Sequence, residues 1–496
     1  MAPSMKGLRR FRRSSPQTQN LISGVALFLT AGIYHAITGL GAGGGKPSSI
    51  YVATTTNSIL YVLFTVVGFF GGSVLNKIGP KITYTVGLSS DQRHIPGHLI
   101  GCFGYPFYAT GLWYFDAKGH QWYPLLGGAI LGITAGLLWT AANFIQFAYP
   151  EEKDKGRFIG MQLFMLATGS TIGAIIPFAI NFHSSSASGV PTSVYITFTV
   201  IMLSAMLVVF FGIVSPEKVT RDDGTHLAIF EAVEFRTELV HCVELLRDWR
   251  ILMLLLPLFS TEITLGLIPT LNAHSCNLRT RSLNNLIYWA IQIPSALFFS
   301  QVLDNHRLTR RMRGMTALSI NVILSVLGWG LAIGIQKRLN LTRGPFKPTL
   351  DWSSPEYGWI CALMIVFGVL FIINQMLVNW TISALSNDPR IAGRTGGFAK
   401  AMLSAGLAVA FGMEAGKAPY MTQTIIQVAL QFSSFAMVAI VVWRAVRDTN
   451  YLVEATVIPP VHVEMELGIS TSAQGAEVAG SDFNGRSSSV HPELKA

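Results

Sequence analysis

The amino-acid sequence predicts an all-α integral membrane protein, with about twelve transmembrane helices in two six-helix halves. Half of its 496 residues are apolar and only 12% are charged, whereas a soluble protein carries roughly 25% charged residues. The mean hydropathy is +0.45. The charged residues fall in short clusters between apolar runs of about twenty residues, which is the length that a helix needs to cross a bilayer.

The apolar runs divide into two sets around a polar connection. We expect spans at 21–44, 50–75, 99–115, 124–148, 158–181 and 193–214, and then at 251–271, 284–303, 315–335, 357–385, 397–415 and 419–445. The expected domains are therefore a basic N-terminus (1–20), a first half (21–214), a connection (215–250), a second half (251–446) and a tail (447–496).

Three segments outside the regular spans have their own expected structures. Residues 88–100 interrupt the third apolar run with polar side chains, so we interpret them as an insertion. The connection carries apolar residues near helical spacing, which predicts an amphipathic helix along the cytoplasmic face: Leu227, Phe230, Val233, Val240, Val243 and Leu246. The tail loses its apolar content, so we expect disorder there.

The distribution of Lys and Arg predicts the orientation. These residues are more frequent in every second loop, starting with the N-terminal segment, and this pattern predicts that both termini lie in the cytoplasm. Lys400 belongs to this expected cytoplasmic set. The net charge of +10 does not indicate nucleic-acid binding, because the basic residues flank apolar runs and form no separate basic domain.

Cofactor and enzyme motifs are not indicated. The four cysteines lie far apart in the sequence, so neither a metal site nor a disulfide framework is expected. The glycines at 39–44 match the spacing of a dinucleotide-binding turn, but an apolar helix precedes them where a strand is needed. We therefore expect no cofactor, no metal and no enzymatic activity.

The loop after the second span resembles the cytoplasmic signature of the major facilitator superfamily. Its defining residues are Gly72, Asn76, Lys77, Gly79, Pro80 and Lys81. The signature usually has Asp where this chain has Asn76, so we expect its charge-pair latch to be weakened. The loop after the eighth span has a related pattern, as two homologous halves would give, in Asp304, Arg307, Arg310 and Arg311. The alternative is that both are ordinary basic loops on the cytoplasmic side.

Three longer stretches resemble the fungal members of the Unc-ninety-three-like branch of that superfamily: GIYHAITGLGAGG (32–44), LLWTAANFIQFAYPEEKDKGRFIGMQLFMLATGSTIGA (137–174) and LRTRSLNNLIYWAIQ (278–292). The resemblance covers roughly residues 20–450 and implies a major-facilitator-type fold. The superfamily moves small solutes by alternating access. Animal members of this branch act instead as a potassium-channel regulatory subunit and as a trafficking chaperone.

Two functions therefore remain open. The first is transport of a small solute, and the second is a regulatory or trafficking role for a partner membrane protein. The expected partners are the lipid bilayer together with a small-molecule solute or a membrane protein. Transport predicts a polar cavity between the halves, whereas an accessory subunit predicts a filled centre.

Polar side chains within spans are costly, so each is a candidate for a site. In the fourth span Trp139, Asn143 and Gln146 share one helical face, and in the tenth span Gln375, Asn379 and Ser383 do the same. Either face can line a central cavity, and the alternative is hydrogen bonding between helices. The ionisable candidates are His35, Glu262 and Glu414, of which Glu262 is the best candidate for ion coupling. Glu414 can instead pair with Lys417, three residues along the helix.

Two sequences match the acceptor for N-linked glycans. Asn340 lies in a predicted external loop, so we expect it to be modified, whereas Asn379 lies within the tenth span and is expected to be unmodified.

Overall fold

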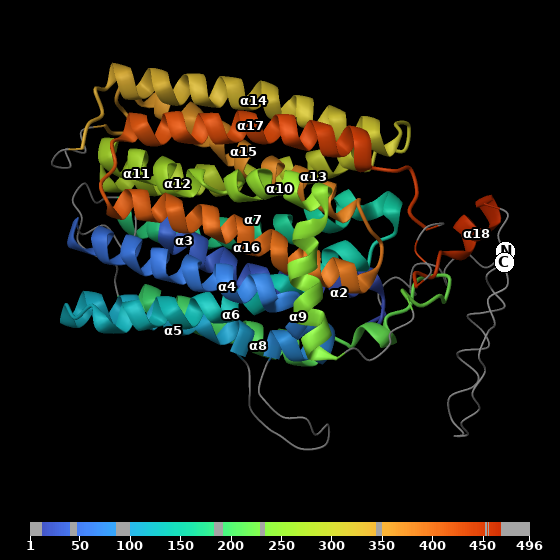
Figure 1. Ribbon diagram of the computed structural model, residues 1–496. Coiled ribbons are helices and arrows are strands. Elements are labelled where there is room, and N and C mark those ends of the chain that lie inside the picture. The colour runs from blue at the N-terminus through green and yellow to red at the C-terminus, as the bar shows by residue number, and fades with distance from the viewer. Residues whose placement is uncertain are drawn as a thin grey trace, which may run out of the picture.

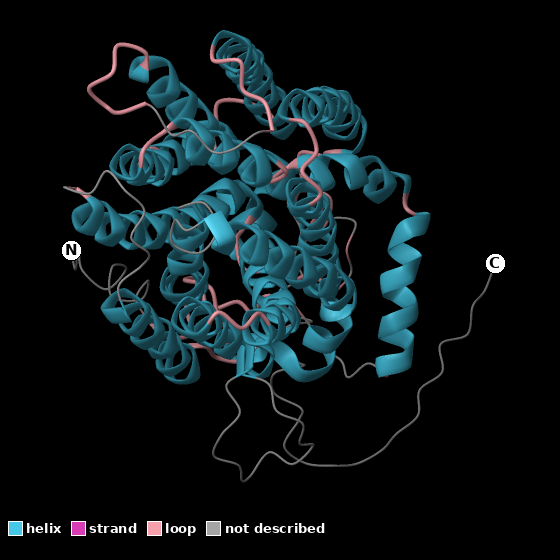
Figure 2. Cartoon of the chain, turned by 90° about the vertical axis from the view of Figure 1, so that its left-hand side faces the viewer, coloured by secondary structure: helices cyan, strands magenta, loops and turns pink. Residues whose placement is uncertain are grey.

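The computed structural model describes residues 12–39, 47–85, 100–182, 192–228, 234–343, 350–451, 454 and 456–467. Its described residues form an all-α bundle of long helices that run nearly parallel, apart from two short ones (Figure 1). Viewed along the helix axes, the helices pack around a common centre (Figure 2). The predicted insertion, 88–100, lies outside the described residues except for Ile100, the first residue of a helix.

The described residues of the first half form seven α-helices, because the first span includes a π-helical turn. That span comprises α2 (Pro16–Leu27), the π-helical turn η1 (Phe28–Gly32) and α3 (Ile33–Gly39). The others are α4 (Pro47–Thr85), α5 (Ile100–Lys118), α6 (Trp122–Ala148), α7 (Lys155–Asn181) and α8 (Thr192–Gly212). A π-helical turn within an α-helix is frequently found at a functional site.

In the part of the second half that the structure describes, two spans are broken and four are continuous. The broken spans are α10 (Trp249–Ser260) with α11 (Thr264–Ser275), and α12 (Leu278–Ala290) with α13 (Gln292–Leu303). The continuous spans are α14 (Arg310–Arg338), α15 (Tyr357–Ser383), α16 (Pro389–Ala415) and α17 (Tyr420–Ala445). Prolines lie inside both parts of the first broken span, Pro257 in α10 and Pro269 in α11, and neither can donate a helical backbone hydrogen bond.

Within the described residues, ten helical segments are long and apolar enough to cross a membrane. The α2–α3 run and α5 are not among these ten, but both lie along the same bundle (Figure 1). Twelve spans are consistent with this arrangement. The end of the bundle that carries α9 (Phe235–Glu244) is called the inner end below, and from the Lys and Arg pattern we expect it to face the cytoplasm.

Two parts of the connection and tail can be compared with the predictions. A short amphipathic helix, α9, forms where one was expected, although residues 229–233 lie outside the described part. The prediction of disorder from residue 447 onward is wrong for the described residues up to 467. Asn450 N–H donates to Glu152 at 2.8 Å, the Glu454 carboxylate accepts from Asn387 N–H at 2.8 Å, and α18 (Val461–Leu467) follows. Polar contacts with the bundle, together with the burial of Tyr451 and Val457, hold this segment.

The halves meet through two pairs of spans. The helix α16 of the second half packs along α4 and α6 of the first, and α7 of the first half packs along α12 and α13 of the second. Glycines allow close packing of several helices. A Cβ atom on Gly406 of α16, for example, would clash with the Phe259 carbonyl oxygen of α10.

Gly406→Val should therefore destabilise the bundle, because the added side chain must push α16 away from α10. We expect a loss of about 1–3 kcal/mol, as overpacking usually causes. Gly412→Val on the same helix is the matched control, since nothing lies within 4 Å of a Cβ atom there. Thermal unfolding of the purified variants in detergent measures both, and equal midpoints for the two would contradict the packing argument.

Candidate functional site

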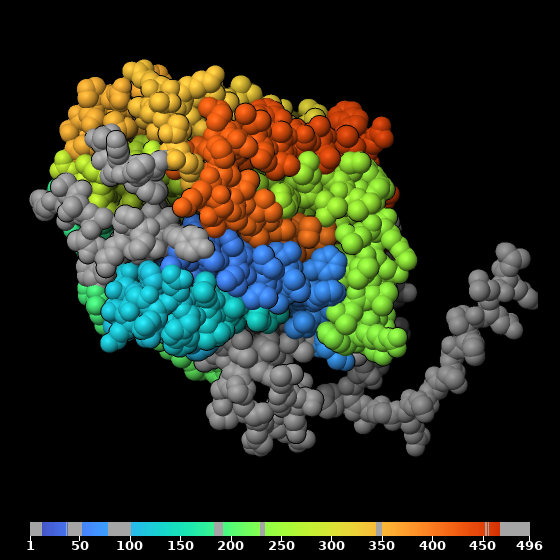
Figure 3. Space-filling view, turned by 60° about the vertical axis from the view of Figure 1, so that its left-hand side comes forward, coloured from blue at the N-terminus to red at the C-terminus, as the bar shows by residue number. Residues whose placement is uncertain are grey.

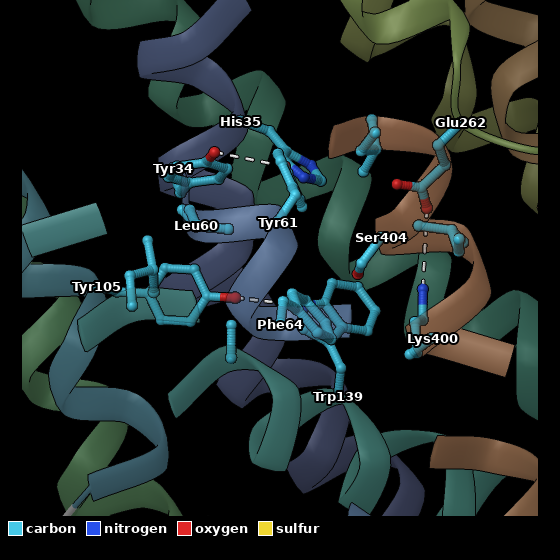
Figure 4. Close-up of a pocket in the computed structure, with 14 residues that line it drawn as sticks. Tyr34, His35, Leu60, Tyr61, Phe64, Tyr105, Trp139, Glu262, Lys400 and Ser404 are labelled. Atoms are coloured by element: carbon cyan, nitrogen blue, oxygen red, sulfur yellow. Dashed lines mark hydrogen bonds and ion pairs between the residues drawn. The ribbon is translucent and has the colours of Figure 1, made fainter. Parts of the chain in front are cut away.

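A small cavity lies between the two halves, near the middle of the bundle. Its volume is about 30 Å³, which is room for roughly one water molecule. The side chains of the first half that line it are mostly aromatic, and those of the second half include two opposite charges (Figure 4). The labelled residues are Tyr34, His35, Leu60, Tyr61, Phe64, Tyr105, Trp139, Glu262, Lys400 and Ser404.

Glu262 and Lys400 form a buried ion pair in this cavity. Lys400 Nζ lies 3.8 Å from Glu262 Oε1, and the two residues are only 2% and 5% exposed. Glu262 lies in the break between α10 and α11, and Lys400 projects from α16. The Lys400 ammonium also lies 3.9 Å from the ring centroid of Trp139 on α6, a cation–π contact that reaches the other half. One lysine thus contacts both a carboxylate of its own half and an aromatic ring of the first half.

His35 is held by aromatic rings. Its imidazole stacks on the Trp289 indole with centroids 5.0 Å apart and planes 12° from parallel. His35 Nδ1 is buried and has no hydrogen-bond partner among the described residues. The same is true of Ser404 Oγ. The cavity therefore contains unpaired polar atoms beside the ion pair, which is an arrangement suited to a polar ligand or a water molecule.

The aromatic side of the cavity is a hydrogen-bonded cluster. Trp139 Nε1 donates to Tyr105 Oη at 3.1 Å, and Tyr34 and Tyr108 each donate to Asn57 Oδ1, at 3.1 and 2.9 Å. These bonds fix the rings of α3, α4, α5 and α6 relative to one another. The position of the Trp139 ring beneath Lys400 is therefore set by the first half of the protein.

The structure separates the candidates of the fourth span. Trp139 lines the cavity, but Asn143 and Gln146 do not. Asn143 donates to the Gly396 carbonyl at 3.0 Å, and Gln146 donates to Gln162 at 3.0 Å. Hydrogen bonding between helices, the alternative reading of these residues, accounts for both.

The candidates of the tenth span are all buried in α15 and do not line the cavity. Ser383 donates to the Trp380 carbonyl at 2.9 Å. The amide atoms of Gln375 have no partner among the described residues. The two candidate glycosylation sites differ in exposure: Asn379 is 3% exposed, and Asn340 lies exposed just after α14.

Glu414 lies apart from the cavity and has a different partner from the one expected. It accepts from Arg343 at 2.9 Å and from Gln423 at 2.8 Å, so the expected pairing with Lys417 is not needed. Arg343 also stacks on the Tyr420 ring, 4.0 Å from its centroid. These contacts join the outer ends of α16 and α17.

Lys400 was assigned from the sequence to a cytoplasmic loop, and that assignment is wrong. The expected span began at residue 397, so Lys400 lay only three residues from its expected end, whereas α16 begins at Pro389 and places Lys400 three turns inside the helix. The signal was present in the sequence. Asp388 caps the helix by accepting from Arg390 N–H, and Pro389 occupies the first turn, which is a common start for a helix.

The residues of the two predicted signature loops lie at the inner end and connect the halves, but α4 continues to Thr85, so the first set is helical and not a loop. Asp304 accepts from the backbone N–H groups of Gly156 and Arg157, at 2.8 and 2.5 Å, at the start of α7. Arg310 donates to Glu152 at 3.2 Å, and Arg311 donates to the Val446 carbonyl at 2.9 Å. Arg307 and Lys77 are exposed, and Gly79, Pro80 and Lys81 lie in α4 with their surroundings outside the described part.

Asn76 contacts the other half of the protein through its amide. It donates to the Arg390 carbonyl at 3.2 Å and to the Glu238 carboxylate of α9 at 2.9 Å. A Cβ atom on Gly72 would lie 2.6 Å from Arg394 Cα, so the backbones of α4 and α16 are in close contact there. Contacts from both sets of signature residues thus join the two halves at the inner end.

Comparison with known proteins identifies relatives along most of the chain. The family model "Ion channel regulatory protein UNC-93" matches residues 49–268. An uncharacterised membrane protein of Schizosaccharomyces pombe is 40% identical over 415 residues, which is 83% of this chain and 81% of that protein. UNC93-like protein 1 of Arabidopsis thaliana is 30% identical over 444 residues, 89% of this chain and 93% of that protein. Notoamide biosynthesis cluster protein O′ of Aspergillus versicolor is 25% identical over 465 residues, 93% of this chain and 95% of that protein.

Solved structures with the same fold are transporters of the major facilitator superfamily. The fucose:proton symporter FucP of E. coli has a TM-score of 0.56 at 12% identity, covering 87% of this chain and 99% of that one. The human organic anion transporter MFSD10 has a TM-score of 0.57 at 11% identity, covering 85% of this chain and 99% of that one. At these identities the likeness concerns the fold alone.

The buried pair should behave as one energetic unit. Glu262→Gln or Lys400→Met alone leaves an unpaired buried charge, which costs about 3–5 kcal/mol, whereas the double variant should lose clearly less than the sum. The exposed pair Arg338–Glu356 is a matched control at the same N···O distance, 3.8 Å, and should couple by about 1 kcal/mol or less. For each pair, thermal unfolding of the wild type, the two single variants and the double variant measures the coupling energy. Additive losses of stability at positions 262 and 400 would contradict the coupling of Glu262 and Lys400.

Asp304 should make stability depend on pH. Burial raises the pKa of its carboxyl from 3.8 to about 7, although the two backbone N–H donors oppose the shift. The folded state then binds the proton more tightly than the unfolded state, so the contribution of Asp304 to stability falls as the pH rises from about 4 to about 7. Unfolding midpoints across that range should show this slope in the wild type and lose it in Asp304→Asn. The exposed Glu217→Gln variant should keep the slope, and an unchanged slope in Asp304→Asn would contradict the assignment.

Proposed function

Because the chain belongs to the UNC93-like branch of the major facilitator superfamily, we propose that it moves a small solute across the membrane by alternating access, with the Glu262–Lys400 pair as its ion-coupling element. The observation that carries this proposal is the buried ion pair in a cavity between the two halves. Stability alone does not account for such a pair, since replacing a buried ion pair by apolar residues often leaves the stability of the folded protein unchanged or increases it.

The pair provides a simple route for coupling. A proton that reaches Glu262 makes the carboxyl neutral and removes the counter-charge of Lys400. The ammonium remains over the Trp139 ring and becomes available to an acceptor on a solute. Release of the proton on the other side restores the pair and displaces the solute. The helix break at Glu262 allows α10 and α11 to move relative to each other during this exchange.

The similar proteins support this reading by analogy. FucP is named as a proton symporter and MFSD10 as an organic anion transporter, and both share the fold. The relative from a notoamide biosynthesis cluster is consistent with a role near small organic molecules. The solute that we propose is accordingly a small polar organic molecule.

A second function is favoured by the size of the cavity and by the family name. With room for roughly one water molecule, the centre is nearly filled by aromatic side chains, as an accessory subunit predicts. In that case the chain regulates a partner membrane protein, and the buried pair serves to orient α16. Transport requires the same cavity to enlarge when the halves move, and the accessory role does not.

Uptake into proteoliposomes distinguishes the two functions. The purified protein is reconstituted and supplied with a metabolite extract at acidic external pH, and accumulated solutes are measured by mass spectrometry. We expect accumulation of at least one polar organic solute in the wild type, driven by the proton gradient. Glu262→Gln mimics the protonated carboxyl and should abolish the dependence on the gradient, because the proton no longer has a site.

The control is Glu217→Gln, an exposed carboxylate after α8, which should leave uptake and its pH dependence unchanged. If the Glu262→Gln variant keeps the pH profile of the wild type, the coupling role is wrong. If the folded wild-type protein accumulates no solute under any gradient, the accessory function is favoured.

A further inference from the structure

The connecting helix α9 lies across the inner ends of α4 and α16, at a large angle to the spans (Figure 1). The space-filling view shows it as a light green band at the edge of the molecule, beside the blue surface of α4 (Figure 3). It therefore joins the halves in sequence and also touches both of them in space. The polar contacts that join it to α4 and α16 involve one buried face.

Glu238 is the central residue of that face. It is 0% exposed, and its carboxylate accepts from Arg394 Nη2 at 2.6 Å and from Arg394 Nε at 2.9 Å. It also accepts from Asn76 Nδ2 at 2.9 Å. A single carboxylate from α9 therefore bridges α4 of the first half and α16 of the second half.

The bridge consists of charge-assisted hydrogen bonds. Burial alone would raise the pKa of Glu238, but the hydrogen bonds from Arg394 and Asn76 outweigh it, so the pKa of this carboxyl lies below its usual value. Glu238 is then charged at neutral pH and forms a two-pronged contact with the guanidinium of Arg394, the strongest geometry for such a pair.

One helical turn further along, Cys242 attaches α9 to α4. Its thiol lies 3.0 Å from Ser73 Oγ, and both residues are buried. Ser73 and Asn76 belong to the same end of α4, so α9 contacts the first half at two successive turns. Its contact with the second half depends on Arg394. If the halves separate at the inner end, α9 can stay with α4, and the Glu238–Arg394 contact is the one that breaks.

We propose that α9 is the latch of the inner gate, and that Glu238 supplies the carboxylate that Asn76 lacks. This inference rests on the proposed alternating access. Closure of the inner end then depends on docking of the connection between the halves. The second signature loop has its own carboxylate, because Asp304 accepts directly from the Gly156 N–H at the start of α7.

The outward face of α9 indicates how the latch is held at the membrane. Val240 and Val243 are 52% and 51% exposed, on the side away from Glu238. A helix with a polar buried face and an apolar outward face, placed at the end of the spans, is suited to the surface of a bilayer. Lipid contact on this face would favour the docked position of α9.

Two thiol reporters test the latch in full-length protein in lipid nanodiscs. Cys242 reports whether α9 is docked, since it is buried against Ser73, and burial raises the pKa of its thiol. A Ser404→Cys substitution reports whether the cavity is open. Labelling rates with a maleimide are followed peptide by peptide by mass spectrometry, and Cys102, which is buried in α5, reports unfolding.

Glu238→Gln should increase the labelling rates of Cys242 and of the thiol at position 404, each by roughly tenfold or more, because a buried guanidinium loses its counter-charge. The rate at Cys102 should not change. Glu244→Gln on the same helix is the matched control and should leave all rates unchanged, since the ion pairs of Glu244 are with His241 and Arg247 of the same connection and with no residue of α4 or α16. Adding Asn76→Asp to Glu238→Gln returns a carboxylate to α4 near Arg394. This double variant should be labelled more slowly at position 404 than Glu238→Gln alone, whereas Cys242 should stay as reactive as in Glu238→Gln.

Wild-type rates at both reporters in Glu238→Gln, or equal increases at Cys102, would overturn the latch. The latch would also be contradicted if adding Asn76→Asp to Glu238→Gln failed to slow labelling at position 404. These rates are measured without any solute, so they are independent of whether uptake is observed. If the labelling rates change as expected but no solute is taken up, the latch proposal stands and only the proposal of solute transport is contradicted.

Discussion

A buried lysine that must be neutralised constrains the centre of this protein. Lys400 is surrounded by apolar and aromatic side chains, and its charge is balanced by Glu262 from the break after α10 and by the π face of Trp139 from α6. An unpaired ammonium in such surroundings costs several kcal/mol, so α16, the α10–α11 break and α6 cannot separate independently. The packing of the two halves at the centre therefore depends on the contacts of the Lys400 ammonium.

The inner end of the bundle is organised by a second set of charges with approximate symmetry between the halves. At one pair of spans, Asp304 at the end of α13 accepts from the first N–H groups of α7. At the other pair, Asn76 at the end of α4 faces α16, and the acidic group comes from α9. The two contacts differ in the origin of the carboxylate. Asp304 belongs to its own loop, whereas Asn76 is an amide and cannot supply the negative charge that pairs with Arg394.

The sequence predicts the fold well, because long apolar runs in a bilayer can only be helices and the loop charges alternate. The site is predicted only in part. Glu262 and Trp139 were identified from cost and spacing, but Lys400 was missed because a lysine near a predicted helix end reads as a loop residue. Asn143 shows the opposite error. Its spacing matches that of Trp139, yet its amide bonds to Gly396, and helical spacing alone cannot tell a cavity from a close helix contact.

Partners distant in sequence were the main features that could not be predicted. Glu238 belongs to a segment whose amphipathic pattern indicates a helix but does not identify which side chains meet it. Its contacts with Asn76 and Arg394 join residues 162 and 156 positions apart. A buried carboxylate within a mostly polar connection is not distinguishable from a solvated one without the neighbouring helices, because burial is a property of the assembled halves.

The centre and the inner end are connected through α16. Arg394 and Lys400 lie on this one helix, so they are separated by about 9 Å along its axis at about 1.5 Å per residue. Gly396 and Gly397 lie between them and bring the helix close to α6 and α4, which leaves little room for bending. A shift of α16 that moves Lys400 away from Trp139 must therefore also move Arg394 relative to Glu238 and strain the contact between them. Under the proposed alternating access, α16 is therefore the element through which a change in the charge of the central pair would reach the contacts at the inner end.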